Sequence, residues 1–261
     1  MKNPIRILLI SDTHGRMDSV NVLAEKTGAE YCFHLGDLCT YTRESVDLFP
    51  ADMLYKQLKH SPLCTGQELA ACADDPERLR QLVKKYRTYG NFEEYLSGAR
   101  HFNIPVYAVT GNNDDAGMEQ TLRGSPVHNL TFLNEHTQIF LGGFQICGLG
   151  GGCRSEAVAS AFRGCCFSSE QIEKLEKSLS SVQENIPRIL LTHIPPQEND
   201  DLARLVKAAR PVLILCGHTH RWNESMTEDS YPVLTLPKST AGYAVLELNG
   251  TCWKYEKIQI S

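Results

Sequence analysis

The chain has 261 residues, 42% of them apolar, and a formal net charge of −5 at pH 7. This length suits one large α/β domain, or a domain with a sizeable insertion, with enough apolar residues for a buried core. Acidic and basic residues are interspersed, which excludes a global basic signature for nucleic-acid binding. No run of 18 apolar residues exists, so no membrane-spanning helix is expected.

The N-terminal residues and the cysteines predict the compartment. The apolar run Ile5–Ile10 is too short for the core of a signal peptide and no small-residue cleavage site follows it, so it is predicted to be a strand. The ten cysteines form neither a CxxC pair nor a regular framework. A chain of this length without an export signal is expected to keep its cysteines reduced, so we predict a cytoplasmic protein.

Five short apolar runs are each followed at once by polar residues that can bind metals. Aliphatic runs of this length predict strands buried on both faces. In such sheets, ligands bind beyond the carboxyl ends of the strands. The runs and their polar residues are Ile5–Ile10 with Asp12 and His14, Tyr31–Leu35 with Asp37, Pro105–Val109 with Asn112, Arg188–Leu191 with His193, and Val212–Cys216 with His218 and His220.

Helical segments and further strands complete the predicted fold. Ser19–Lys26 is predicted to be a helix, and Ser168 and Gln171 predict a capping box at the start of a helix that runs to Leu179. A second group of strands is predicted to be antiparallel. Its members are Gln138–Leu141, Phe144–Cys147, Val233–Leu236, Tyr243–Leu248 and Cys252–Ile258. Two packed sheets with helices outside them are therefore expected.

The stretch from about Thr40 to Phe102 differs from the rest of the chain. It is polar and helical in composition, and the spacing of apolar residues in Pro76–Tyr89 predicts an amphipathic helix. We therefore expect residues 1–261 to form one domain with a helical insertion at about residues 40–102.

The spacing of the polar residues indicates a metal site. Asp12 and His14 are two residues apart on an extended segment, so both side chains can reach one ion, and His218 and His220 repeat this spacing. Asp37 follows Gly36, whose missing side chain leaves room for a carboxylate that bridges two ions. Mixed carboxylate and imidazole ligands suit Mn, Fe or Zn.

These motifs resemble those of the calcineurin-like metallophosphoesterases, which run Asp-x-His, Gly-Asp, Gly-Asn-His-Asp/Glu, a lone His and Gly-His-x-His. The resemblance implies a four-layer αββα sandwich of two mixed sheets. It also implies ligand roles: one metal would be held by Asp12, His14 and His220, the other by Asn112, His193 and His218, and Asp37 would bridge them.

The implied activity is hydrolysis of a phosphate ester by attack of a metal-bound hydroxide, with phosphodiesters favoured over monoesters. This chain departs from the family motif because Gly111-Asn112-Asn113-Asp114 carries Asn113 where the family has a catalytic His. An imidazolium can protonate a leaving oxygen, whereas Asn can only donate a hydrogen bond to a phosphate oxygen. Asn113 and Asp114 are the candidate catalytic residues.

Other residues could support the site or the substrate. His34 is predicted to be a core residue or to support a ligand, and Gly150-Gly151-Gly152 is predicted to be a tight turn near the site. Arg154 and Arg163 could meet phosphate, but solvated surface is the preferred interpretation. The same holds for the basic cluster Lys84–Arg87, so a nucleic-acid substrate is kept as an alternative but not favoured.

Two alternative functions follow from the same motifs. The position of the insertion resembles that in lariat-debranching enzymes, which suggests an RNA-directed phosphodiesterase, although those enzymes tend to carry Cys in place of the first Asp. A non-catalytic binding module, as in the retromer subunit of similar fold, usually loses ligands, whereas all seven positions remain here. The substrate expected on balance is a small or nucleotide-like phosphate ester.

Overall fold

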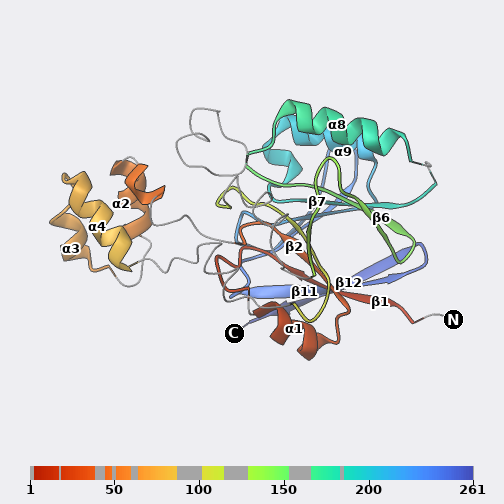
Figure 1. Ribbon diagram of the computed structural model, residues 1–261, viewed down its shortest axis with the longest axis horizontal. Helices are drawn as coiled ribbons and strands as arrows, with labels where there is room; N and C mark the ends of the chain where they lie inside the picture. Colours follow the sequence, from red (N-terminus) through yellow and green to blue (C-terminus); the bar gives the residue numbers. More distant parts are fainter. Residues whose placement is uncertain are drawn as a thin grey trace.

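The computed structural model describes residues 3–17, 19–38, 45–48, 51–59, 64–86, 102–114, 129–152, 166–182 and 185–260. Two six-stranded sheets pack face to face and helices cover their outer faces (Figure 1). Both sheets contain parallel and antiparallel pairs. The predicted four-layer αββα sandwich of two mixed sheets is confirmed.

The first sheet has the strand order β12-β11-β1-β2-β3-β4. Its strands β1 to β4 run parallel, and β11 is antiparallel to both β1 and β12. The carboxyl ends of β1, β2 and β3 therefore lie at one edge of this sheet. The strands are β1 (Ile5–Ile10), β2 (Tyr31–Leu35), β3 (Val106–Val109), β4 (Leu130–Phe132), β11 (Gly242–Asn249) and β12 (Cys252–Gln259).

The second sheet has the order β5-β6-β7-β8-β10-β9. Strands β6, β7, β8 and β10 are parallel, while β5 and β9 close the two edges in antiparallel pairs. The strands are β5 (Ile139–Leu141), β6 (Phe144–Leu149), β7 (Arg188–Thr192), β8 (Leu213–Cys216), β9 (Asn223–Met226) and β10 (Pro232–Thr235).

The predicted second group of antiparallel strands is partly wrong. The β5–β6 and β11–β12 hairpins are antiparallel as expected, and Gly250, at φ +63°, turns the chain between β11 and β12. However, the two hairpins belong to different sheets, and β10 pairs in parallel with β8. The chain passes from one sheet to the other between β10 and β11. The order of the strands along the sequence does not show this change of sheet.

Apolar side chains fill the space between the two sheets and beneath the helices. The inter-sheet core combines residues such as Leu9, Phe33 and Phe144, all fully buried. Helix α1 (Ser19–Thr27) packs Val20 and neighbours on the outer face of the first sheet, and α8 and α9 cover the second. The other helices of the sandwich are α8 (Ser169–Ser180), the short η2 (Pro196–Glu198) and α9 (Asp200–Ala209).

Helix α8 begins at the predicted capping box, which is confirmed. The Ser168 hydroxyl accepts a hydrogen bond from the N–H of Gln171, and the Gln171 side chain accepts one from the N–H of Ser168. Both contacts satisfy N–H groups that the first helical turn leaves unpaired. The sequence thus fixes where this helix starts.

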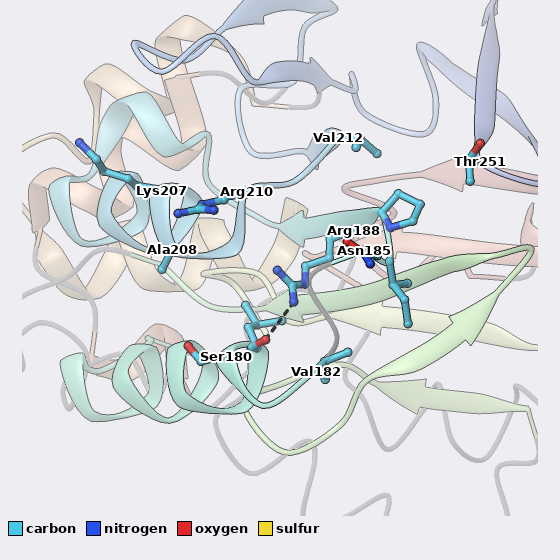
Figure 2. Close-up of a pocket in the computed structure, with 12 residues that line it drawn as sticks. Ser180, Val182, Asn185, Arg188, Lys207, Ala208, Arg210, Val212 and Thr251 are labelled. Atoms are coloured by element: carbon cyan, nitrogen blue, oxygen red, sulfur yellow. Dashed lines mark hydrogen bonds between the residues drawn. The ribbon is translucent and has the colours of Figure 1, made fainter.

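The first residue of β7, Arg188, joins the carboxyl ends of α8 and α9 (Figure 2). Its buried guanidinium donates to the carbonyl oxygens of Leu179 (2.9 Å) and Ala209 (3.1 Å), and to Oε1 of Gln145 (2.7 Å). Because the last carbonyls of a helix have no partner within the helix, this arginine satisfies both helix ends at once. A cavity of about 600 Å³ opens beside it.

The described helices of the predicted insertion share a small core of their own. They are η1 (Ser45–Leu48), α2 (Ala51–Lys59), α3 (Gly66–Ala70) and α4 (Pro76–Tyr86), and Figure 1 shows α2, α3 and α4 to one side of the sandwich. Val46, Leu54, Leu79 and Val83 are buried against one another. Phe102, at the predicted end of the insertion, is instead buried against the outer face of the first sheet.

Candidate metal centre

The structure brings all seven predicted ligands to one place. Each follows the carboxyl end of a parallel strand, three of these strands in the first sheet and two in the second. The two sheet edges meet there because the sheets pack face to face. The strands and the residues that follow them are β1 with Asp12 and His14, β2 with Asp37, β3 with Asn112, β7 with His193, and β8 with His218 and His220.

One group of ligand-type side chains comprises Asp12, His14 and His220, with Asp37 beside them. These four residues each offer a ligand atom, and all four atoms lie within 4.8 Å of one another. Oδ1 of Asp12 is 3.0 Å from Nε2 of His220 and 4.0 Å from Nε2 of His14. We call Asp12, His14 and His220 the first ligand group.

A second ligand group comprises Asn112, His193 and His218. The amide oxygen of Asn112 lies 3.0 Å from Nε2 of His193 and 2.9 Å from Nδ1 of His218. The two imidazole rings pack edge to face with centroids 5.1 Å apart. Three potential ligand atoms from three strands thus converge on one point.

The carboxylate of Asp37 lies between the two ligand groups. Its Oδ2 is 3.9 Å from Nε2 of His14, and its Oδ1 is 3.5 Å from Nε2 of His193. The carboxylate is almost fully buried. One oxygen therefore faces each group.

The donor set fits divalent cations. Nδ1 of His193 is 2.7 Å from the carbonyl oxygen of Leu35, which can only accept, so Nδ1 carries the hydrogen. In the neutral ring, Nε2 then carries a lone pair that points toward the amide oxygen of Asn112. Two acceptor atoms that face each other repel, and a cation bound to both would remove this repulsion. Oδ1 of Asp12 is also buried without a hydrogen bond of suitable geometry in the described part of the chain.

Five of the seven residues have left-handed backbone conformations, with φ between 46° and 69°. This region is uncommon for residues other than glycine, and each such residue costs on the order of 1–3 kcal/mol. Strained backbone of this kind collects at functional sites because the surrounding structure holds it in place. The five residues are Asp12, His14, Asp37, His218 and His220.

Several supporting contacts could not be read from the sequence. Oδ2 of Asp12 accepts from the Ser11 hydroxyl (2.5 Å) and from the N–H of His218 (3.2 Å), which turns Oδ1 toward the first ligand group. A Cβ at Gly217 would lie 1.9 Å from the Ser11 hydroxyl oxygen. Oε2 of Glu198 lies 4.0 Å from Nε2 of His218, whereas Asn112 faces Nδ1 of the same ring. Such contacts orient ligands and tune their basicity.

His34 contacts the loop that carries Asp12 and His14 of the first ligand group. It is fully buried, and its Nε2 is 3.0 Å from the hydroxyl of Thr13, which lies between Asp12 and His14. That hydroxyl also donates to the carbonyl oxygen of Leu38 (3.1 Å). Burial lowers the pKa of His34 to about 3, so the ring is neutral. His34 thus combines the two roles that were predicted as alternatives, because it is buried in the core and also supports the ligand loop.

The two candidate catalytic residues make different contacts. The backbone N–H of Asn113 donates to Oδ1 of Asp37 (2.8 Å), and its side-chain amide donates to Oδ2. Asp114 is fully buried, and its Oδ2 accepts from the N–H of Gly111 (2.6 Å). Asn113 therefore contacts the carboxylate between the two ligand groups, whereas Asp114 closes the turn that presents Asn112.

Burial and neighbouring charges set the protonation of the cluster. Burial chiefly lowers the pKa values of His14 and His218, which favours the neutral ring that binds metals. Burial alone would raise the pKa of Asp12, but the proximity of His220 and His193 holds it well below its usual range. Burial likewise opposes the charged form of His193, but Asp37 and Asp12 outweigh it and raise its pKa.

The other predicted residues fall into three groups. Gly150–Gly152 follows β6 beside the site, where a Cβ at Gly152 would lie 2.5 Å from Cβ of Asn112. Arg154 and Arg163 lie outside the described residues. In the basic cluster, Lys84 pairs with Asp47 (2.5 Å) and Lys85 with Glu68 (3.6 Å), which agrees with a solvated, charge-paired helix face.

A two-sheet sandwich with carboxylate, amide and imidazole groups gathered at its strand ends defines the class of this protein as a candidate metallohydrolase. The chain belongs to the calcineurin-like phosphoesterase family, whose characteristic sequence it matches over residues 5–222. The resemblance stated from the motifs is thereby confirmed. Family membership supports a metal-dependent phosphoric ester hydrolase, and the Asp/His cluster suggests a dinuclear divalent-metal site.

Solved structures share the fold at low sequence identity. The dimetal phosphatase from Danio rerio aligns over 100% of both chains with a TM-score of 0.54 and 11% identity. GAP50, the anchor in the inner membrane complex of Plasmodium, aligns over 99% of this chain and 85% of its own, with a TM-score of 0.56 and 11% identity. Identities this low support the fold alone. No curated protein sequence matches the chain.

Among the described helices, none combines the length and the apolar composition that crossing a membrane requires.

Proposed function

We propose that this protein hydrolyses phosphodiester bonds in a small or nucleotide-like substrate at a dinuclear centre of Mn, Fe or Zn ions. In this proposal the first ligand group and the second ligand group each hold one ion, and Asp37 bridges them. The supporting observation is the position of Asp37, whose two carboxylate oxygens face opposite groups at 3.9 and 3.5 Å. The free thiols of the described cysteines accord with the cytoplasmic location that we also propose.

Different residues of the chain would have different roles in this reaction. Two divalent ions, when bound, would supply positive charge to the phosphoryl oxygens and lower the pKa of a water from about 15.7 toward 7. Ser11 and the N–H of His218 orient Asp12, and the carbonyl of Leu35 orients His193. Asn113 would place an amide, which cannot transfer a proton, where the family motif has a general acid. Substrates whose leaving oxygen departs without protonation are therefore favoured.

The preference for phosphodiesters over monoesters follows from the family resemblance, because some subfamilies that lack the third-motif His are phosphodiesterases. The family motif carries an imidazole at position 113 that assists leaving groups, and this chain lacks it. The alternative of an RNA substrate is not carried forward, because Lys84 and Lys85 face acidic residues of the insertion. A non-catalytic scaffold is disfavoured because no ligand-type residue is missing from either ligand group.

A direct assay tests this proposal. The purified protein, loaded with Mn, should hydrolyse bis-p-nitrophenyl phosphate with a higher kcat/KM than p-nitrophenyl phosphate. Asp37→Asn should lose most of this activity while keeping the fold. Higher activity on the monoester would refute the substrate class, and absence of activity on both esters, with metal bound, would refute the enzyme assignment.

A further inference from the structure

Strand β12 forms one edge of the first sheet, and among the described residues it pairs with β11 alone. It is 8 residues long. Such an edge carries backbone N–H and C=O groups that a further strand can pair with. Its side chains alternate between the two faces of the sheet. Trp253 and Tyr255 pack against the inter-sheet core, so Lys254 and Glu256 lie on the outer face, where both are exposed.

A row of alternating charges crosses this outer face and ends at the edge. Arg6 on β1 lies opposite Glu247 on β11, and Glu247 lies opposite Lys254 on β12. The guanidinium of Arg6 and the ammonium group of Lys254 each lie 2.8 Å from one oxygen of the Glu247 carboxylate. The Lys254 side chain is 78% exposed. The row therefore reads positive, negative, positive, and an acidic side chain on a strand paired with β12 would continue it.

Glu256 is the acidic residue that a second copy of the chain can supply. Its carboxylate makes neither an ion pair nor a hydrogen bond within the described ranges. When two identical strands pair antiparallel about a two-fold axis, one residue faces its own copy, and residues equally distant from it on either side face each other. With Tyr255 on this axis, Lys254 of each copy faces Glu256 of the other.

The neighbouring registers oppose like charges. An axis at Lys254, Glu256 or Lys257 would place that charged residue opposite itself, and like charges directly opposite destabilise a strand pair. The axis at Tyr255 gives two pairs of opposite charge on the outer face, and on the inner face it sets Trp253 opposite Lys257. Lysines on an edge strand normally oppose pairing between copies, and this register avoids that repulsion.

We propose that the chain forms a symmetric dimer in which two β12 strands pair antiparallel with Tyr255 on the two-fold axis. The first sheets of the two copies then form one continuous sheet. The metal ligands that belong to this sheet follow β1, β2 and β3, and β11 separates these strands from β12, so the interface excludes the ligand loops. A contact made by one strand pair is small, so the dimer is weak and its population depends on protein concentration. The inference is independent of the proposed function.

Charge reversals on β12 test both the dimer and its register. Sedimentation equilibrium of the wild type should show a monomer–dimer equilibrium at concentrations up to about 1 mM. Lys254→Glu and Glu256→Lys each set like charges opposite in both symmetry-related pairs, so each variant alone should dimerise roughly 10-fold or more weakly. A mixture of the two variants in equal amounts should recover dimers, because each β12 strand then faces the opposite charges of the other.

The matched controls are Lys26→Glu and Glu25→Lys, which make the same charge changes at exposed positions of α1 and should leave the dimer unchanged. Circular dichroism verifies the fold of each variant. Glu256→Lys breaks no ion pair of the fold, so its effect decides the question if Lys254→Glu does not fold. A wild type that stays monomeric up to about 1 mM would overturn the inference. Dimers that survive either reversal, or that the mixture fails to restore, would overturn it as well.

Discussion

Asn113 binds both oxygens of Asp37, through its backbone N–H to Oδ1 at 2.8 Å and through its side-chain amide to Oδ2. A residue that commonly acts as a proton donor in this family is here replaced by one that holds the carboxylate between the two ligand groups. The amide can position Asp37 but cannot release a proton. The replacement of the family's His by Asn113 therefore bears on which leaving groups the enzyme can expel.

Wild-type activity should therefore fall steeply as the pKa of the leaving group rises. An aryl oxide departs without protonation, whereas an alkoxide requires an acid. Asn113→His should flatten this dependence and raise the rate with alkyl esters by up to roughly 10²-fold, the lower end of general acid catalysis. The measurement is kcat/KM against leaving-group pKa for a series of phosphodiesters. A shallow slope in wild type would show that another group already acts as the acid.

Gly111 should tolerate no side chain, because it packs directly on Asp37. A Cβ there would lie 2.2 Å from the backbone nitrogen and from Oδ1 of Asp37. Gly111→Ala should displace the carboxylate, weaken Mn binding roughly 10-fold or more, and destabilise the fold by about 1–3 kcal/mol. Gly66→Ala is the control, since a Cβ there meets nothing within 4 Å. Equal Mn affinity in both variants would contradict this packing argument.

Arg188 should contribute strongly to stability without affecting metal binding. Arg188→Met removes its donors to Gln145 and to the carbonyls of Leu179 and Ala209, and the Leu179 carbonyl keeps the longer hydrogen bond from the N–H of Val182 (3.4 Å). A buried acceptor that loses its partner costs about 1–3 kcal/mol. We expect a loss of about 3 kcal/mol in the free energy of unfolding, measured by urea denaturation. The control Arg204→Met breaks an exposed pair with Glu176 and should cost less than about 1 kcal/mol. A similar small loss in both variants would show that the helix ends do not need this arginine.

The insertion should shape substrate choice rather than metal chemistry. Its described helices bury Val46, Leu54, Leu79 and Val83 among themselves. Replacing residues 45–86 with a flexible linker should therefore leave the sandwich folded and its Mn content unchanged, while the ratio of kcat/KM values across a panel of phosphate esters shifts. The circular dichroism spectrum should lose helix only in proportion to the segment removed. A folded variant that no longer binds Mn would show that the insertion supports the metal centre.

Much of the site could be predicted because strand ends carry their ligands in local motifs. Asp12 and His14, like His218 and His220, lie two residues apart after an apolar run, and a short motif records such spacing. The capping box at Ser168 is equally local, and it marks the start of α8. The order of strands within the sheets is not local, and for this reason the sequence pattern wrongly places β10 in a group of antiparallel strands.

The contacts that support the site lie far apart in sequence and leave no motif. The turn that follows β10 lies beside the loop of Asp12 because the N–H of Ser239 donates to the carbonyl oxygen of Ser11, more than two hundred residues earlier in the chain. Arg188 joins two helix ends that no pattern around it specifies. The sequence patterns also do not predict helix α9 or the edge strands β4 and β9, and these two strands are short and only partly buried. Tertiary packing, rather than periodicity, determines these features.

Metal stoichiometry tests the central claim of a dinuclear centre bridged by Asp37 most directly. The protein is loaded with Mn, freed of excess ions and analysed for bound metal per chain, in wild type and in Asp37→Asn, with circular dichroism to verify the fold. Two ions per chain in wild type and fewer in the variant are predicted, because each oxygen of Asp37 faces one ligand group. A wild-type stoichiometry that stays at one after loading, and that Asp37→Asn leaves unchanged, would contradict the account.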